Sequence, residues 1–370
     1  IKFNLMRTFC LSLLIISLVF GAPVLARDQW TIDQANAWYQ SHKWFIGCNF
    51  IPSTAVNTLE MWQQETYDPV TIDRELGYAQ SIGFNIIRVF LHHLVWQQDP
   101  TAFKLRLANF LSIADSHNIK TMFVLFDDCW NPEAKLGPQP APIPGVHNSQ
   151  WVQAPGASEI TNTTLFPVFE AYVKDVIGSF ANDNRVVMWD IYNEPGNSGH
   201  VLNTLPLLTN VFQWARAADP SQPITAGAWS MSKNFDQLNA LQLTQSDVNT
   251  FHTYSLPDAT SSAIDTYKSY QRPVICTEYM ARKIGSTFQT HVPIFHDKNV
   301  GCINWGLVKG KTNTIFPWGS PEGAPEPKVW FHDVFHPDGT PFAQEEIDVI
   351  RNYSGVAQKA QNSFEFLEYQ

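Results

Sequence analysis

Two glutamates stand where acid–base chemistry could be performed, each at the end of a short apolar run. Glu194 ends a run that begins at Arg185, and Glu278 ends a run that begins at Arg272. Proline cannot donate to a sheet ladder, so we expect the first run to be a strand that stops at Pro195. Two carboxyl groups at strand ends, one protonated and one ionised, are what the cleavage of a glycosidic bond requires.

The segments that must position these glutamates alternate between strand-like and helix-like patterns. Eight strands are expected, at residues 44–50, 84–91, 121–126, 186–193, 224–229, 248–254, 274–279 and 300–308. Helices are expected after them, at residues 71–81, 102–116, 164–180, 202–218, 235–243, 262–270, 287–297 and 342–352. This order predicts a single parallel (β/α)8 TIM barrel, an α/β fold, with long loops after the third and eighth strands. A doubly wound open sheet is the alternative, but no Gly-rich phosphate loop follows the first strand.

In such a barrel the active site lies at the carboxyl ends of the strands. Glu194 and Glu278 end the fourth and seventh strands, so their side chains should face each other across the mouth. A separation of about 5 Å between the carboxyl groups would give retention of the anomeric configuration. A wider gap would leave room for water and give inversion.

Other polar side chains are expected beside this pair. An arginine inside an apolar strand is costly unless it is paired, so Arg88 on the second strand could pair with one glutamate and keep it ionised. Alternation along the sixth strand points His252 and Tyr254 to the same side, where the Tyr254 hydroxyl could hold a carboxylate. His92 and His93 should point to opposite sides because they are adjacent, which argues against a shared metal ion. We predict no metal and no cofactor.

Aromatic residues are abundant, with 13 Trp, 11 Tyr and 25 Phe. A cleft lined with rings would suit the flat faces of sugars. Candidate sugar-binding side chains lie near several strand ends: Asn193 on the fourth strand, Asp127, Asp128 and Trp130 after the third, Trp305 on the eighth, and Asn57, Glu60 and Trp62 after the first. Trp318 and Trp330 flank the last long loop and could wall the cleft.

The N-terminal residues have the pattern of a secretory signal peptide. Met6 and Arg7 precede an apolar run from Phe9 to Phe20, and Val24-Leu25-Ala26 resembles a cleavage site. The run is short for a membrane span, and an uncleaved N-terminal anchor is the alternative. We therefore expect a secreted or periplasmic protein that is free of the membrane after cleavage. Three parts are predicted: a signal peptide at 1–26, a catalytic domain at 27–360 and a tail at 361–370.

The overall charge and the cysteines narrow the function further. The net charge of −10 argues against a nucleic-acid partner, which needs a basic face, and suits a neutral substrate. The cysteines are scattered without a CxxC pair, which argues against zinc. We expect Cys48, Cys276 and Cys302 to be buried free thiols, because each lies in an apolar run. Oligomeric state is left open by these patterns.

The ordered set of strand-end residues resembles the retaining (β/α)8 glycoside hydrolases, closest in pattern to glycoside hydrolase family 5, over roughly residues 44–352. The residues that carry the resemblance are Asn193-Glu194-Pro195 on the fourth strand, Thr277-Glu278-Tyr279 on the seventh, His252 and Tyr254 on the sixth, Arg88 on the second and Trp305 on the eighth.

The resemblance implies a secreted enzyme that cleaves β-glycosidic bonds of a neutral oligo- or polysaccharide by double displacement. It implies that Glu278 is the nucleophile and Glu194 the acid/base. It further implies that Asn193 binds the 2-hydroxyl of the sugar, that Arg88 and Tyr254 support Glu278, and that His252 lies near Glu194.

The chain departs from the family pattern at two places that border the sugar. Many relatives place a histidine at the end of the third strand, where this chain has Asp127-Asp128, and the segment with Glu60 and Trp62 is not the common form. A substrate therefore does not carry over from cellulases or mannanases. An extra carboxylate that grips a terminal sugar would favour exo action.

Other function classes give distinct expectations. A transglycosylase could use the same site, and would transfer sugar faster than it hydrolyses. A non-catalytic carbohydrate-binding barrel would not need a matched pair of glutamates. A metal-dependent or Schiff-base barrel enzyme has less support, because no lysine lies at a strand end; Lys309 follows the eighth strand without an evident partner.

Overall fold

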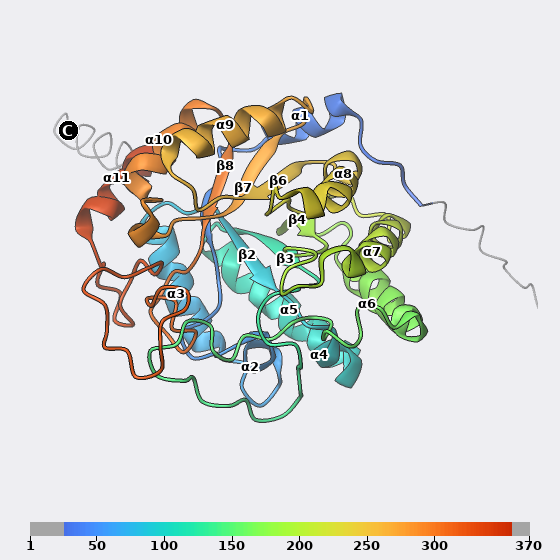
Figure 1. Ribbon diagram of the computed structural model, residues 1–370, viewed down its shortest axis with the longest axis horizontal. Coiled ribbons are helices and arrows are strands. Elements are labelled where there is room, and N and C mark those ends of the chain that lie inside the picture. The colour runs from blue at the N-terminus through green and yellow to red at the C-terminus, as the bar shows by residue number, and fades with distance from the viewer. Residues whose placement is uncertain (1–25, 357–370) are drawn as a thin grey trace, which may run out of the picture.

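The computed structural model describes residues 26–356, and these residues form the predicted (β/α)8 barrel. Eight parallel strands run in the order β5-β4-β3-β2-β1-β8-β7-β6, with helices around them (Figure 1). Beyond the short β5, Ala228 bridges to Phe251 of β6 and brings the two ends of the sheet together. The strands are β1 (Ile46–Asn49), β2 (Ile86–Phe90), β3 (Lys120–Val124), β4 (Val186–Asp190), β5 (Ile224–Thr225), β6 (Asn249–His252), β7 (Val274–Tyr279) and β8 (Gly301–Asn304).

All eight predicted helices are present, within a few residues of their expected bounds. They are α3 (Pro69–Ser81), α5 (Pro100–Ser116), α6 (Phe166–Ser179), α7 (Leu205–Ala217), α8 (Asp236–Gln245), α9 (Pro257–Lys268), α10 (Phe288–Asp297) and α11 (Gln344–Ser354). Three helices were not predicted: α1 (Ile32–Gln40), α2 (Thr58–Trp62) and α4 (His93–Gln98). α2 and α4 are each shorter than two turns, so they carry little periodic signal. The described residues also contain four short 3-10 helices: η1 (Thr163–Leu165), η2 (Val201–Thr204), η3 (Lys233–Phe235) and η4 (Arg282–Ile284).

Local sequence explains where several helices begin. Asp68 accepts a hydrogen bond from the Thr71 N–H, and proline occupies the first turn of α3. Asp99 caps α5 in the same way through the Ala102 N–H, again with proline in the first turn. Such a cap satisfies an N–H that would otherwise have no partner, and proline is preorganised for the first helical position.

The core has two layers. Ile86, Met122, Met188 and Ile303 belong to a cluster inside the barrel that also includes Tyr39 of α1. A larger cluster lies between the strands and the outer helices. The strands are thus covered on both faces, as an all-parallel sheet requires.

Several strands end earlier than their sequences indicate, yet the backbones that follow β4 and β5 stay paired. β4 stops at Asp190, but the Asn193 N–H still donates to the Phe126 carbonyl at 2.7 Å. After β5, the Ala228 N–H donates to the Thr250 carbonyl at 3.1 Å. The chain that delivers Glu194 is therefore held by the sheet almost up to the glutamate.

The predicted parts at the two ends of the chain are not described by the structure. The signal peptide lies outside the described residues except for its last residue, and the tail at 361–370 lies wholly outside them. Within residues 26–356, the helices are all too short or too polar to cross a membrane.

Candidate active site

A cavity of about 900 Å³ opens at the carboxyl ends of the strands. Its lining includes Glu194 and Glu278, together with His252, Tyr254 and Asn193. The barrel thus brings side chains from β4, β6 and β7 to one place, as the sequence predicted.

Glu278 is held by a cation and a hydroxyl. The Arg88 Nη1 donates to its Oε1 at 2.9 Å, and the Tyr254 hydroxyl donates to its Oε2 at 2.8 Å. Burial raises the pKa of Glu278, while the Arg88 charge and the Tyr254 hydrogen bond act in the opposite direction. With a buried cation in direct contact, Glu278 is the glutamate better suited to remain ionised.

Arg88 is itself fully buried at the centre of a polar network. Its Nε and Nη2 both donate to Asp190 Oδ2, at 2.9 and 2.8 Å, and its Nη2 also donates to Asn193 Oδ1 at 2.6 Å. The remaining nitrogen, Nη1, is shared between Glu278 and Asn49. These bonds offset the cost of burying a guanidinium and fix it beneath Glu278. Asp190, the last residue of β4, was not singled out from the sequence.

Glu194 has a different environment. Its carboxylate accepts from the thiol of Cys129, at 3.2 Å from Sγ to Oε2, and from the Asn197 side-chain amide. Among residues 26–356, no cation contacts it apart from the titratable ring of His252. Burial raises the pKa of Glu194, which favours the protonated form that a proton donor needs.

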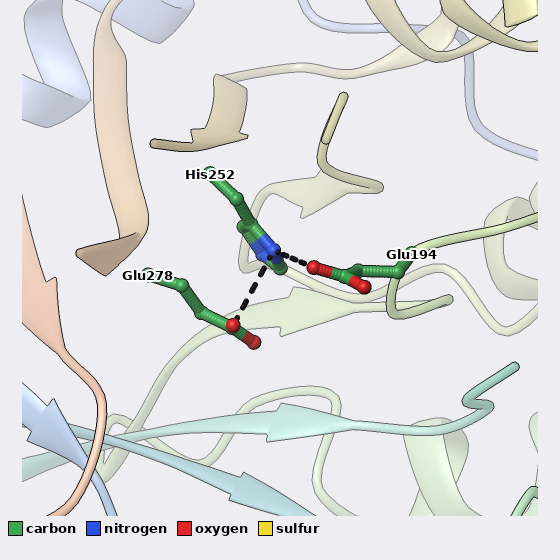
Figure 2. A group of neighbouring side chains, drawn as sticks. All are labelled: Glu194, His252 and Glu278. Atoms are coloured by element: carbon green, nitrogen blue, oxygen red, sulfur yellow. Dashed lines mark hydrogen bonds and ion pairs between the residues drawn. The ribbon is translucent and has the colours of Figure 1, made fainter. Parts of the chain in front are cut away.

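His252 lies between the two glutamates (Figure 2). Its Nδ1 is 2.7 Å from Glu194 Oε1 and 3.5 Å from Glu278 Oε2. Burial lowers the pKa of His252 to about 4, so the ring is neutral at neutral pH. A neutral ring with its proton on Nδ1 can donate to Glu194 and hold that side chain over the cavity.

The two carboxyl groups are close together. The nearest suitable oxygens of Glu194 and Glu278 and the His252 nitrogen all lie within 4.8 Å of one another. This spacing matches the short separation of retaining glycosidases rather than the gap of about 6.5–9.5 Å in inverting ones.

The same three side chains are the group among residues 26–356 whose donor atoms are close enough to surround a metal ion. However, the 2.7 Å between His252 and Glu194 is a hydrogen-bond length. Two ligands at about 2.0–2.1 Å from one tetrahedral zinc would lie roughly 3.3 Å apart. The geometry is therefore accounted for by hydrogen bonding.

Asp127 and Asp128 have separate places, and only Asp127 lines the cavity. Asp127 Oδ1 accepts from the Asn193 side-chain amide at 2.8 Å, and Oδ2 accepts from the Trp151 indole at 2.7 Å. Asp127 thus orients Asn193, which also lines the cavity. Burial raises the pKa of Asp127 to about 6.

The prediction that Asp128 binds sugar is wrong. Asp128 is fully buried and accepts from the Tyr192 hydroxyl at 2.7 Å, the Gly196 N–H at 2.7 Å and the Thr204 hydroxyl at 2.6 Å. These donors lie on both sides of Glu194, whose φ of 43° is in the left-handed region. Asp128 therefore braces the strained turn that carries Glu194.

The loop after β1 does not reach the cavity, so the sugar-binding predictions for its residues are wrong. Trp62 is fully buried, donates to the Phe90 carbonyl and stacks on Tyr67. Glu60 pairs with Lys311 at 2.7 Å. Asn57 caps α2. The mixture of polar and apolar residues after β1 does not show from the sequence that the later loops, which supply Gln150 and Lys311, will contact this segment.

Of the tryptophans predicted to lie at the cavity, some do line it and others do not. Trp130, Trp305 and Trp318 line the cavity, and Trp130 and Trp318 are each 41% exposed. Trp330 does not line it; its ring is buried and stacks on Phe342. Four further rings that were not predicted from the sequence also line the cavity: Trp151, Trp229, His147 and Tyr267.

His92 and His93 do not point to opposite sides as predicted. Their rings stack with centroids 5.0 Å apart, because the strand has already ended and His92 is the N-cap of α4. Burial lowers the pKa of His92 to about 3. Both are buried core side chains rather than cavity residues.

The cysteines at 48, 129, 276 and 302 are all buried and free, as expected for the three that were predicted. Cys129, which contacts Glu194, was not among the predicted site residues. The sequence feature that could have identified Cys129 is its position directly after the two aspartates at the end of the third strand.

Comparison with known proteins places the site in a family. The model of the cellulase family, glycosyl hydrolase family 5, matches residues 47–310. The chain belongs to glycosyl hydrolase family 5. It is therefore an O-glycosyl hydrolase, in agreement with the resemblance seen in its motifs.

Solved structures of low sequence identity share the fold of this family 5 chain. GH5_18 from Streptomyces cattleya, solved with Manβ1-4GlcNAc, is 11% identical with a TM-score of 0.57, over 85% of this chain and 81% of that chain. An endo-1,4-β-D-mannanase from Thermotoga petrophila is 15% identical with a TM-score of 0.56, over 85% and 100%. The exo-β-1,4-mannosidase Op5Man5 from an Opitutaceae bacterium is 15% identical with a TM-score of 0.59, over 85% and 60%.

A curated relative matches a shorter stretch. The β-glucuronidase of Chlorocebus aethiops is 28% identical over 120 residues, which is 30% of this chain and 18% of that protein. The family 5 chain thus aligns with less than a fifth of that relative's length, so nothing about the relative's activity carries over from the match.

Proposed function

We propose that this protein hydrolyses β-glycosidic bonds of a neutral oligo- or polysaccharide with retention, using Glu278 as nucleophile and Glu194 as acid/base. The observation that carries the proposal is the pair of carboxyl groups within 4.8 Å, of which only Glu278 contacts a permanent cation. That asymmetry divides the pair into one ionised and one protonated member, as double displacement requires.

The proposed reaction has two steps. Ionised Glu278 attacks the anomeric carbon while Glu194 gives its proton to the departing glycosidic oxygen, which leaves an ester between the sugar and Glu278. Glu194, now ionised, takes a proton from a water molecule, and the resulting hydroxide attacks the same carbon and releases Glu278. The sugar keeps its anomeric configuration because it is inverted twice.

Neighbouring side chains serve these steps. Arg88 and Tyr254 stabilise the charge that returns to Glu278 when the ester breaks. Asn193, oriented by Asp127, is placed to bind the 2-hydroxyl of the sugar, and Trp305 offers a flat face to its ring.

The cavity lining favours a neutral sugar. Three carboxyl groups line it, those of Asp127, Glu194 and Glu278, and no lysine or arginine among residues 26–356 does so. A uronic acid would find no cation to pair with its carboxylate and would meet like charge instead. This speaks against a glucuronide as substrate.

The test uses the two glutamates separately. Glu278→Gln should abolish hydrolysis of aryl β-glycosides. The Glu194→Ala variant should hydrolyse substrates with a poor leaving group at least a thousandfold more slowly than the native enzyme. Added azide should restore its turnover of a dinitrophenyl glycoside, with the β-glycosyl azide as the product. Normal hydrolysis by both variants would refute the proposal. Aryl β-mannosides, β-glucosides and β-xylosides form the substrate panel, and β-mannosides come first because solved neighbours are named for mannan.

We also propose that the protein is exported, on the basis of the signal-like residues 1–26. Expression of the full sequence in a secreting host and sequencing of the mature N-terminus tests this. Export predicts a start near Arg27 in the medium or periplasm; an intact N-terminus inside the cell would contradict it.

A further inference from the structure

The two longest loops of the barrel are joined into one wall. The segment after β3 (residues 125–162) and the segment after β8 (305–343) are linked by backbone bonds from the Asn148 N–H to the Thr312 carbonyl and from the Gly323 N–H to the Pro144 carbonyl, each 2.8 Å long. Their backbones approach so closely that a Cβ on Gly145 would lie 2.5 Å from the Ala324 nitrogen.

Side chains reinforce this junction. The Asn313 amide donates to the carbonyls of Ile143 and Val146, at 2.9 and 3.2 Å, and the Ser320 hydroxyl donates to the Gly145 carbonyl at 2.6 Å. The wall therefore has a fixed shape rather than being two independent loops.

The wall covers the ends of β1 and β2. The segment after β1 is bound from above, because the Asn57 amide donates to the Gln150 carbonyl at 2.9 Å and the Lys311 N–H donates to the Ser53 carbonyl at 3.0 Å. In Figure 1 the loop after β3 passes around α2, which belongs to that segment. As a result, the residues that line the catalytic cavity include none from the segments after β1 and β2.

Behind the wall there is no room for a sugar. Trp151 and Trp305 pack edge to face with ring centroids 5.7 Å apart and form its inner surface. The space beyond them, lined by Phe50 and Phe90, has a volume of about 20 Å³. That is scarcely more than the roughly 10–15 Å³ that one water molecule needs.

The opposite side of the cavity is open. The connections after β4 and β5 are short, running over residues 191–200 and 226–232. After β6 the wall reaches the cavity again, because Trp318 packs edge to face against Tyr254. Side chains there are exposed at the rim: Met231, which lines the cavity, is 62% exposed.

The orientation of the substrate follows from the two glutamates. The departing group takes its proton from Glu194, so it lies on the β4 side, where Asn197 and Trp229 also line the cavity. The sugar that stays on Glu278 lies on the other side, against Trp305 and the wall. The closed side therefore faces the non-reducing end of the substrate.

We propose that the wall formed by residues 125–162 and 305–343 makes this enzyme exo-acting, so that it removes a terminal sugar from the non-reducing end of a β-linked chain. The inference rests on the proposed function, which supplies the assignment of Glu194 and Glu278. It does not depend on Asp128, which is buried and cannot grip a terminal sugar.

The test compares a free and a blocked chain end. After an aryl β-monoglycoside has identified the sugar, the matching β-1,4-linked hexaose is labelled at its reducing end with 2-aminobenzamide. A second sample also carries a 4,6-O-benzylidene group on its non-reducing terminal sugar. The proposal predicts that the free hexaose gives labelled pentaose before any shorter labelled product. It also predicts that the blocked hexaose is cleaved at least a hundredfold more slowly than the free hexaose.

The outcomes separate this proposal from the proposed function. Internal cuts in the blocked hexaose would overturn exo action and leave the glycosidase assignment standing. Failure to hydrolyse any aryl β-glycoside or hexaose would refute both.

A variant tests the wall directly. Asn313→Ala combined with Ser320→Ala removes three hydrogen bonds between the loops without changing a residue that lines the cavity. Cleavage of the blocked hexaose should rise at least tenfold, while kcat/KM on the aryl monoglycoside stays within about threefold. Asn210→Ala, which removes a similar amide–carbonyl bond at the surface of α7, is the matched control and should change neither. If hydrogen exchange shows residues 143–148 released and the blocked hexaose still resists, the wall does not restrict the site.

Discussion

Partners, rather than position, distinguish the two glutamates of the cavity. Glu278 contacts the guanidinium of Arg88 and the hydroxyl of Tyr254, whereas Glu194 contacts a thiol, an amide and a neutral imidazole. A permanent cation favours ionisation of the first, and burial without one favours protonation of the second. The same residue type thereby acquires two proposed roles.

The hydrogen bond from the Cys129 thiol should influence the pKa of Glu194, the proposed proton donor. Burial raises the pKa of that thiol well above the ordinary value, so the sulfur keeps its proton and donates to Glu194. Removing this donor with Cys129→Ala should raise the pKa of Glu194, since the ionised form loses a hydrogen bond. Activity that requires protonated Glu194 is lost as pH rises through that pKa. In the plot of kcat/KM against pH, the alkaline limb should therefore shift to higher pH by roughly half a unit to one unit.

The control for Cys129 is Cys129→Ser, which keeps a donor and should leave the alkaline limb near that of the native enzyme. A second readout is the leaving group: Cys129→Ala should slow poor leaving groups more than dinitrophenol, which needs no proton. An alanine variant with the native pH profile and the native leaving-group dependence would show that the thiol has no such role.

At the level of elements, the turn after β4 depends on a residue from a different strand. Glu194, Ser198 and Val201 have φ values of 43°, 53° and 45°, a conformation that is uncommon for residues other than glycine. Such strain persists only where surrounding bonds hold it. Asp128, which follows β3, provides three of those bonds.

Replacing Asp128 should therefore damage both stability and the acid/base. Asp128→Asn leaves one acceptor oxygen for three buried donors and should lower the free energy of unfolding by about 2–4 kcal/mol, measured by urea denaturation. It should also lower kcat at least tenfold with a smaller change in KM, because Glu194 is displaced. Asp73→Asn, at a largely exposed carboxylate, is the control and should cost about 0.5 kcal/mol or less. A variant at position 128 as stable and active as the native enzyme would contradict this role.

The pattern of strands and helices made the barrel predictable. The barrel in turn predicted that Glu194 and Glu278 lie close together at the carboxyl ends of the strands. Arg88 was also predictable, because a charge inside an apolar strand demands a partner. What the sequence did not reveal was which loop covers which. Trp62 and Glu60 follow β1 just as Trp130 follows β3, but Trp62 is buried against Phe103 and Phe110 of α5 and Glu60 pairs with Lys311 of the last long loop. Trp130 instead stays at the cavity and is 41% exposed. Such contacts join residues far apart in sequence and carry no local periodic signal.

At the scale of the whole molecule, buried carboxyl groups should make stability depend on pH. Glu75 of α3 is fully buried, and burial raises its pKa to about 7 even though it accepts from the Ser53 N–H and hydroxyl. Because the folded pKa exceeds the unfolded value, the native state binds the extra proton, and stability falls as pH rises towards 7.

Glu75→Gln should remove that dependence and can keep both contacts with Ser53. Between pH 5 and pH 8 the native enzyme should lose roughly 1–3 kcal/mol of stability relative to the variant, followed by urea denaturation at each pH. Other buried carboxyl groups contribute equally to both proteins, so the difference isolates Glu75. Parallel pH profiles of stability for the two proteins would refute the argument.

The most direct measurement of the central claim is to trap the covalent intermediate. A 2-deoxy-2-fluoro-β-glycosyl fluoride of the preferred sugar should inactivate the enzyme, because the fluorine slows the release of the ester more than its formation. Peptide mapping by mass spectrometry should then place one added sugar on Glu278. A label on Glu194, or a first hydrolysis product of inverted configuration by proton NMR, would contradict the assignment of Glu278 as nucleophile and Glu194 as acid/base.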